Sequence, residues 1–249
     1  MRYFLDVSYD GTAFHGYQIQ PNAITVQEVL EKSISTMLRN KTSVMASGRT
    51  DTGVHAIQQI IHFDSVEKLD PDRFAHKLNG FLPRTISINA ISPVIAEAHA
   101  RFDAEKRSYE YKMHSKKNPF AVGRSLHVPY LLDLEKIEEA CDILLNTRNF
   151  QALSKVHTEV NHFECEIFAI SWQSINDDHL FTVKANRFLR GMIRAMVGTL
   201  LEIGQGRMTL ERLQEVLNNK NRSDAGKAVA PEGLYLRKIE YPAHIYISQ

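Results

Sequence analysis

A single carboxylate, Asp51, lies among small residues in a segment whose composition suits chemistry. The segment, residues 46–56, reads ASGRTDTGVHA and lies between two apolar, strand-like runs. Gly48 and Gly53 permit backbone angles that are closed to other residues, and Arg49 favours the ionised form of the carboxylate. An ionised aspartate in such a loop can act as a nucleophile or as a base. The alternative is a hairpin turn closed by an Asx-type hydrogen bond, and spacing alone does not choose between the two.

Basic residues recur on a long helix that the sequence predicts over Arg187–Ile203. Most of this helix is apolar, which indicates burial on most sides. The remaining face carries small and basic residues at helical spacing, namely Arg187, Arg190, Gly191, Arg194 and Gly198. An arginine in an apolar helix either finds an anion or extends to solvent. Asp51 is a candidate anion for this face.

The elements that position Asp51 are predicted from periodicity and helix caps. Alternating or apolar runs indicate strands over residues 2–9, 42–46, 54–63 and 86–91. Thr25 and Glu28 form a capping box at the start of one helix. Pro71 suits the first turn of a second helix, which runs to about Leu78. The predicted order of the first half is therefore β-α-β-β-α-β.

The second half repeats a similar order. Strands are predicted over residues 108–113, 165–172, 180–185 and 234–241, and helices over residues 134–145, 187–203 and 209–217. We therefore predict an α+β fold of two ferredoxin-like units, whose mainly antiparallel sheets join around a central cleft. The boundary falls near residues 96–104, which lack clear periodicity, and this gives domains 1–104 and 105–249.

Composition and charge narrow the possible functions. The chain has 249 residues, of which 43% are hydrophobic, enough for two domains with buried cores. Its formal net charge is only +1, but residues 101–124 and 184–207 each carry an excess of four positive charges. Two basic patches suit a polyanion bound in one groove. The two cysteines have no metal-ligand spacing and no apolar run is long enough for a membrane span, so we expect no metal, no membrane segment and a cytoplasmic location.

Five segments, in order, resemble the motifs of the TruA-type tRNA pseudouridine synthases, and the resemblance extends from end to end of the chain. The segments are residues 9–16 (YDGTAFHG, followed by Gln18 and Gln20), 48–56 (GRTDTGVHA), 100–104 (ARFDA, followed by Arg107 and Tyr109), 186–200 and 230–234 (APEGL). Five ordered matches are far more specific than any one of them. The sequence is therefore identified as a member of this family by resemblance.

The resemblance implies an isomerase that converts uridine to pseudouridine in the anticodon stem-loop of tRNA, at positions 38, 39 and 40. It implies a homodimer with no metal and no cofactor. By its motifs, Asp51 matches the nucleophile, Tyr109 the ring that stacks on the target uracil, and Arg194 the basic partner of the aspartate. Leu234 is a candidate for the apolar wall opposite that ring. Candidates for phosphate contacts are Arg49, Arg101, Arg107, Arg187 and Arg190.

The implied chemistry fits a carboxylate and leaves its route open. The reaction breaks the bond from ribose C1′ to uracil N1 and joins C1′ to C5 without a net change in composition, so no redox or group-carrying cofactor is required. The carboxylate can add to the base, add to the sugar or remove a proton from the sugar. His55 could assist, although an imidazole just inside a strand is more often structural.

One departure and two alternative functions remain. Glu166 stands in a stretch where the family often has an arginine, which concerns any RNA or dimer contact made there. A non-catalytic RNA-binding protein would explain the basic patches, but it gives no use for Asp51, because acids repel phosphate. A metal-dependent hydrolase is disfavoured, because no second carboxylate or histidine lies at ligand spacing near Asp51.

Overall fold

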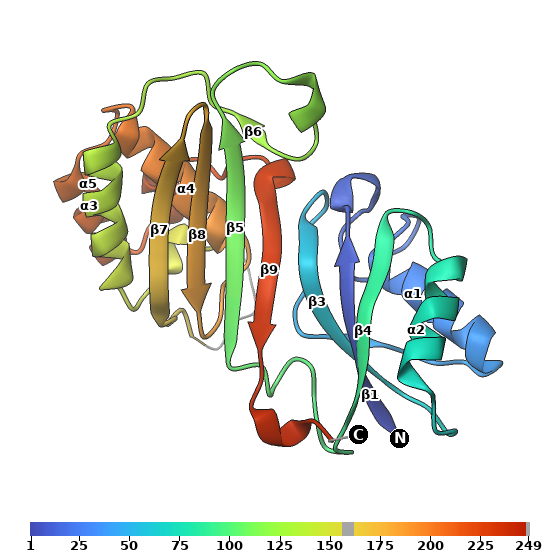
Figure 1. Ribbon diagram of the computed structural model, residues 1–249. Coiled ribbons are helices and arrows are strands. Elements are labelled where there is room, and N and C mark those ends of the chain that lie inside the picture. The colour runs from blue at the N-terminus through green and yellow to red at the C-terminus, as the bar shows by residue number, and fades with distance from the viewer. Residues whose placement is uncertain (156–161, 248–249) are drawn as a thin grey trace. The chain divides into compact units, whose positions relative to one another are not determined.

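Figure 1 shows the computed structural model, which describes residues 1–155 and 162–247. Contacts divide the chain into two compact units. The first unit is Met1–Arg107 together with the segment that begins at Tyr235, and the second is Ser108–Leu234. The sequence places the domain boundary at residue 104 and assigns the last strand to the second domain, whereas the contacts group that strand, from Tyr235 onward, with the first unit.

The first unit is built on a mainly antiparallel sheet with the strand order β4-β1-β3-β9. Its strands are β1 (Arg2–Tyr9), β2 (Met45–Ala46), β3 (His55–Asp64), β4 (Ile86–Val94) and β9 (Leu234–Glu240). β1 pairs antiparallel with both β3 and β4, and β2 pairs antiparallel with β3. β9 is the exception, because it pairs with β3 in parallel, with Tyr235 opposite His55.

Two helices, α1 (Val26–Leu38) and α2 (Pro71–Phe81), belong to this unit. The Thr25 hydroxyl accepts the Glu28 N–H at the start of α1, as the capping box predicts. The Asp70 side chain caps α2 by accepting the Arg73 N–H, and Pro71 occupies its first turn. The helices contact each other and α2 packs on β4. The predicted β-α-β-β-α-β order is confirmed.

The strand predicted over residues 42–46 is wrong in extent, since only Met45–Ala46 pairs with a neighbour. The backbone before it is bound by side chains of α1 instead of by a strand. The Thr42 N–H donates to the Ser35 hydroxyl at 2.9 Å, and the Val44 N–H donates to a Glu31 carboxylate oxygen at 3.1 Å. Helix side chains therefore satisfy backbone donors that a strand partner would otherwise take.

The second unit has the strand order β5-β8-β7, with β5 (Lys106–His114), β7 (Ile167–Ile175) and β8 (Asp178–Ala185). The short strand β6 (Leu126–His127) pairs with β5 in parallel. β7 and β8 form an antiparallel hairpin, whose turn places Asn176 at a φ of 56°. Asparagine tolerates this left-handed conformation better than most residues. Both units are thus α+β with mainly antiparallel pairing, which confirms the predicted fold class.

The helices of the second unit are α3 (Leu134–Leu145), α4 (Met192–Gly204) and α5 (Leu210–Asn219). α3 packs against β7, α4 and α5, and α4 lies behind β7 and β8 in the view of Figure 1. α4 is buried along most of its length, as its apolar composition predicts. Short 3-10 turns occupy Gly11–Ala13, Pro119–Ala121, Gln151–Leu153, Arg222–Asp224, Pro231–Gly233 and Ala243–Ile245.

The predicted start of the long helix at Arg187 is wrong, because α4 begins at Met192. Gly191 precedes it with a φ of +73°, a left-handed conformation that stops the helix from extending toward Arg187. The carbonyl of Arg190 instead accepts the Lys155 N–H at 2.8 Å. Arg187, Arg190 and Gly191 therefore do not lie on one helical face with Arg194. Of the predicted stripe, only Arg194 and Gly198 are on the helix.

Candidate active site

Asp51 lies in the connection between β2 and β3, in the first unit, with its side chain half-buried. Its carbonyl accepts the Val54 N–H at 3.1 Å, which closes a tight turn just before β3. Gly53 adopts a φ of +76° inside that turn, as the sequence predicts for this glycine. Gly48 has no such constraint, since its φ is not positive and a Cβ built on it meets no atom within 4 Å.

The backbone before Asp51 is fixed by buried polar groups. The Ser47 N–H donates to the Ile60 carbonyl at 2.8 Å. Gln59, which is fully buried, donates from Nε2 to the Gly48 carbonyl at 2.9 Å and accepts from the Ser47 hydroxyl. The Thr50 hydroxyl bonds the Tyr9 hydroxyl at 2.8 Å. The carboxylate is therefore carried on a loop that is bonded by residues of both β1 and β3.

The glycine-rich segment after β1, residues 10–17, packs directly against the Asp51 loop. The Tyr17 N–H donates to the Thr50 carbonyl at 3.1 Å, and the Gly53 N–H donates to the Phe14 carbonyl at 3.4 Å. A Cβ on Gly11 would lie 2.1 Å from the Val54 carbonyl oxygen, and Gly16 has a φ of +85°. The motif at residues 9–16 thus supports the motif at residues 48–56. The sequence analysis noted Gly11 and Gly16 within the first motif but did not predict this contact.

His55 is structural, as the sequence interpretation favoured. Its ring is 2% exposed and stacks on Tyr235 with the ring centroids 4.5 Å apart. Nδ1 accepts the Gly11 N–H at 3.1 Å. A carboxylate oxygen of Asp10 lies 3.3 Å from the same nitrogen. His55 thereby joins β9 to the segment that braces Asp51.

The three arginines of the first unit that are predicted to contact phosphate differ in their exposure to solvent. Arg49 is exposed, two residues from Asp51. Arg101 is also exposed, and its guanidinium lies 5.6 Å from the ring centroid of Phe102. Arg107 is half-buried and donates to the carbonyls of Ala104 at 2.8 Å and Arg101 at 2.9 Å. These bonds tie Arg107 to the backbone of the turn that carries Arg101.

His62, on β3, bonds the backbone of the same turn, and its protonation should make the stability of the protein depend on pH. Its Nδ1 accepts the Ala100 N–H at 3.1 Å. Burial, followed by the charges of Arg2 and His99, lowers the pKa of His62 from 6.5 to about 4. The neutral ring therefore contributes stability that is complete above the unfolded pKa and is lost as pH falls toward the folded pKa.

We expect the free energy of unfolding to fall by about 3 kcal/mol between pH 7 and pH 4 on account of His62. His62→Asn should reduce that fall, because the Asn Oδ1 can accept the same N–H without a proton to gain. Urea unfolding of both proteins at pH 7, 5.5 and 4 measures the difference. Identical pH dependence in the two proteins would contradict the assignment, and His76→Asn, on an exposed position of α2, is the control.

In the second unit, Tyr109 packs against another aromatic ring and Leu234 is buried. Tyr109, on β5, packs edge-on against Phe188 with ring centroids 5.1 Å apart and an interplanar angle of 82°. Its side chain is half-buried. Leu234 is 7% exposed at the start of β9. The turn before it is held by Tyr111, whose hydroxyl donates to the Ala230 carbonyl at 2.7 Å and whose pKa is raised by burial.

Arg194 lies in the first turn of α4 and is half-buried. Its Nε donates to the Val229 carbonyl at 2.6 Å, and its own carbonyl accepts the Val229 N–H at 3.1 Å. Gly198 permits this close approach, because a Cβ there would lie 1.8 Å from the Lys227 carbonyl oxygen. The side chain of Arg194 is thus oriented by the segment at residues 227–229, which sequence reasoning did not single out.

Arg187 and Arg190 lie in the irregular segment before α4. Arg187 is half-buried and bonds the ring of His162 at 2.8 Å, while Arg190 is exposed. Glu166, the acid noted as a departure, forms an ion pair with Arg148 at 2.9 Å. The position is therefore occupied by an acid with a basic partner from its own unit.

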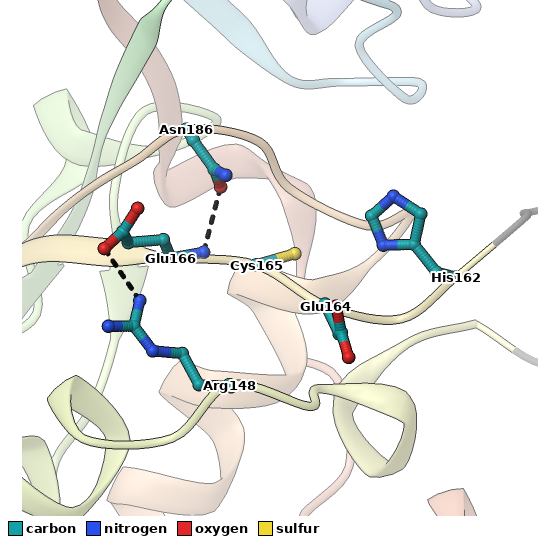
Figure 2. A pocket seen from close by; sticks show the side chains of 6 residues that line it. All are labelled: Arg148, His162, Glu164, Cys165, Glu166 and Asn186. Carbon is teal, nitrogen blue, oxygen red and sulfur yellow. Dashed lines mark hydrogen bonds and ion pairs between the residues drawn. The ribbon is translucent and has the colours of Figure 1, made fainter.

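A pocket with a volume of about 340 Å³ lies in the second unit, and both residues of that ion pair line it (Figure 2). Its lining residues are Arg148, His162, Glu164, Cys165, Glu166 and Asn186. Asn186 accepts the Glu166 N–H at 2.9 Å and fixes one wall. Burial raises the pKa of the Cys165 thiol to about 11, so this sulfur is not activated as a nucleophile.

Within residues 1–155 and 162–247, the helices are too short or too polar to span a membrane. The same residues contain no group of three or more His, Cys, Asp or Glu side chains placed to hold a metal ion.

The sequence was compared with known proteins. The family described as tRNA pseudouridine synthase matches residues 7–103 and 140–242. The "tRNA pseudouridine synthase A" of Parabacteroides distasonis is 42% identical over 246 residues, which cover 98% of each chain. That of Bacillus licheniformis is 36% identical over 245 residues, with 97% of this chain and 99% of the relative covered. These matches define an isomerase of RNA.

The chain belongs to the tRNA pseudouridine synthase family, whose members convert uridine to pseudouridine. This confirms the resemblance seen in the five motifs. Among solved structures, one titled as a Cbf5–Nop10–Gar1 complex matches with a TM-score of 0.36 and 13% identity. That match covers 80% of this chain and 45% of the other chain, less than half of its length.

Proposed function

We propose that the protein isomerises uridine to pseudouridine in the anticodon stem-loop of tRNA, at positions 38, 39 and 40, with Asp51 as the nucleophile. The observation that carries this proposal is the bracing of the Asp51 loop. Buried Gln59, the Tyr9 hydroxyl and the segment at residues 10–17 all bond its backbone or its flanking side chains. Such a held carboxylate reaches its target atom without reorganising during the reaction.

The reaction balances without an outside reagent. The bond from C1′ to N1 breaks, the base turns, and a bond from C1′ to C5 forms. The proton that leaves C5 is matched by the proton that N1 gains. Asp51 serves by adding to the base or the sugar, or by removing a proton from the sugar, and it must be ionised for each of these.

We propose that Tyr109 supplies the ring on which the flipped uracil stacks, with Leu234 as the apolar wall opposite. Phe188 packs against Tyr109 and limits the positions of its ring. Flipping a base costs a few kcal/mol, and stacking on an aromatic ring returns about 1–3 kcal/mol. Arg49, Arg101, Arg187 and Arg190 are proposed to contact phosphates, while the bonds of Arg107 favour a positioning role.

The proposed function is tested with unmodified tRNA in which the uridines are tritiated at C5. Isomerisation releases tritium to water, because C5 loses its hydrogen. Transcripts with cytidine at positions 38, 39 and 40, singly and together, should lose the release in proportion to the sites removed. Binding of tRNA without any release would favour a non-catalytic RNA-binding protein. Activity that disappears with a chelator would favour the metal-dependent alternative.

We further propose that the active form is a homodimer in the cytoplasm. The proposal rests on the family, and a twofold arrangement would let two subunits share one anticodon arm. Sedimentation equilibrium at micromolar protein concentration measures the mass. A monomer at concentrations that support full activity would contradict the dimer.

Arg194 is proposed as the partner of Asp51, and its substitution gives a prediction. Arg194→Ala should lower kcat by about 100-fold or more, because a charge-assisted contact to an ionised carboxylate is lost. Arg194→Lys should retain part of the activity. The affinity for tRNA should change by less than about threefold, as judged by fluorescence anisotropy. The control is Arg207→Ala, an exposed arginine paired with Glu202. Normal kcat in Arg194→Ala would remove Arg194 from this role.

A further inference from the structure

An exposed aromatic ring projects from a rigid turn of the first unit. Phe102 is 74% exposed, in the turn formed by residues 99–104 between β4 and β5. Most of this ring meets water, so its burial contributes little to folding, and its exposed face is open to a planar group that could stack on it.

The backbone of the turn is held by several side chains at once. The His99 Nδ1 lies 3.1 Å from the Arg101 N–H and 3.3 Å from the Phe102 N–H, and accepts from both. The Asp103 carboxylate accepts the His99 N–H at 2.7 Å. Arg107 donates to the carbonyls of Arg101 and Ala104. These bonds leave the turn little freedom.

Two more contacts anchor the turn to the sheet. The Ala100 N–H donates to His62 on β3, and the Ala100 carbonyl accepts from the Tyr241 hydroxyl at 2.5 Å. The Phe102 ring rests on His99, with centroids 4.3 Å apart. The ring is therefore presented at a fixed place, since both its backbone and its neighbour are bound.

The chemistry around the ring indicates what it binds. The Arg101 guanidinium lies 5.6 Å from the ring centroid and is exposed. An aromatic face beside a cation suits a nucleobase and the phosphate next to it. A protein interface needs a wider apolar patch than one ring.

We propose that Phe102 stacks on an unpaired nucleobase of the tRNA, distinct from the target uridine, and that Arg101 contacts an adjacent phosphate. Arg107 acts through the turn as a positioning residue. This inference rests on the proposed function in one respect, since it takes the RNA to be tRNA. It assigns a second contact point on the substrate, at a distance along the chain from Asp51.

The test uses the full-length protein and an unmodified tRNA transcript. Phe102→Leu should weaken binding by about 5- to 100-fold, the range for loss of one stacked base, and raise KM by a similar factor. The single-turnover rate at saturating protein should change by less than about threefold. Phe102→Trp should bind like the wild type. The control is Phe81→Leu, an exposed phenylalanine at the end of α2.

Variants of Arg101 and Arg107 distinguish a phosphate contact from a positioning role. Arg101→Ala should lower the slope of log affinity against log salt by about one, as for the loss of one phosphate contact. Arg107→Met should weaken binding as Phe102→Leu does, and the double variant should be no weaker than either single variant. Arg107→Lys should restore part of the loss.

Wild-type affinity in Phe102→Leu overturns the inference, as does a change in its sedimentation without a change in RNA binding, which would indicate a contact with a second copy. Neither result affects tritium release by the wild type, which tests the proposed function separately. If the wild type released no tritium but its binding to tRNA still depended on Phe102, the proposed function would be contradicted and the stacking contact would still be supported.

Discussion

Asp51→Asn is expected to abolish tritium release from tRNA, with a fall in the single-turnover rate of at least about 10⁴-fold. The amide keeps the shape of the side chain but cannot act as a nucleophile or a base at neutral pH. The loop should persist, because the bonds described above come from its backbone and from Ser47 and Thr50. Affinity for tRNA should therefore stay within about threefold of the wild type.

Three measurements make this result specific. The rate is measured with protein in excess over tRNA, the affinity by anisotropy, and the stability by urea unfolding. The control is Asp72→Asn, an exposed acid in the first turn of α2. A rate within tenfold of the wild type in Asp51→Asn would remove Asp51 from the chemistry, whatever its effect on binding.

Gly11→Ala is the second large prediction, and it acts without touching the carboxylate. The new Cβ would lie 2.1 Å from the Val54 carbonyl oxygen and 2.6 Å from its carbon, so the two segments must separate. We expect a loss of about 1–3 kcal/mol in the free energy of unfolding. We also expect a fall of about 100-fold in rate, since a displacement near 1 Å is enough to misplace a reacting group.

A glycine without neighbours provides the matched control for Gly11→Ala. Gly80 lies within α2, and a Cβ built there meets nothing within 4 Å. Gly80→Ala should leave the rate unchanged and stabilise the protein by about 0.5–1 kcal/mol, because alanine loses less entropy in a helix. Wild-type rate and stability in Gly11→Ala would show that the segment at residues 10–17 does not brace the loop.

Local signals predicted much of the fold. The Thr25–Glu28 capping box and Pro71 predicted the helix starts of the first unit, and periodicity predicted the order of its elements along the chain. The start of α4 could not be read in this way. Phe188 and Leu189 extend the apolar pattern past the true start, whereas the stop at Gly191 depends on a backbone conformation that hydrophobic spacing does not encode.

The sequence was enough to select the residues of the candidate site, but it did not predict the contacts that hold those residues in place. The run around Asp51 was visible in the sequence, and Gly53 has the positive φ that only glycine adopts readily. Gly48, which was singled out with it, meets no close atom, whereas Gly11 and Gly16 approach the Asp51 loop closely. Contacts between segments far apart in sequence, such as Tyr9 with Thr50 or Arg194 with Val229, follow from packing. The pairing of Asp51 with Arg194 stays a prediction, and the Arg194 variants test it.

The parallel pairing of β9 with β3 has a consequence for the order of events during synthesis. The chain leaves the first unit at Arg107 and re-enters it at Tyr235, so all of the second unit is made before β9 exists. Tyr235 then stacks on His55, which bonds the segment that braces Asp51. On the ribosome, the second unit can fold as an insert while the first still lacks a strand. The loop that carries Asp51 therefore acquires the support of Tyr235 only when the final strand emerges.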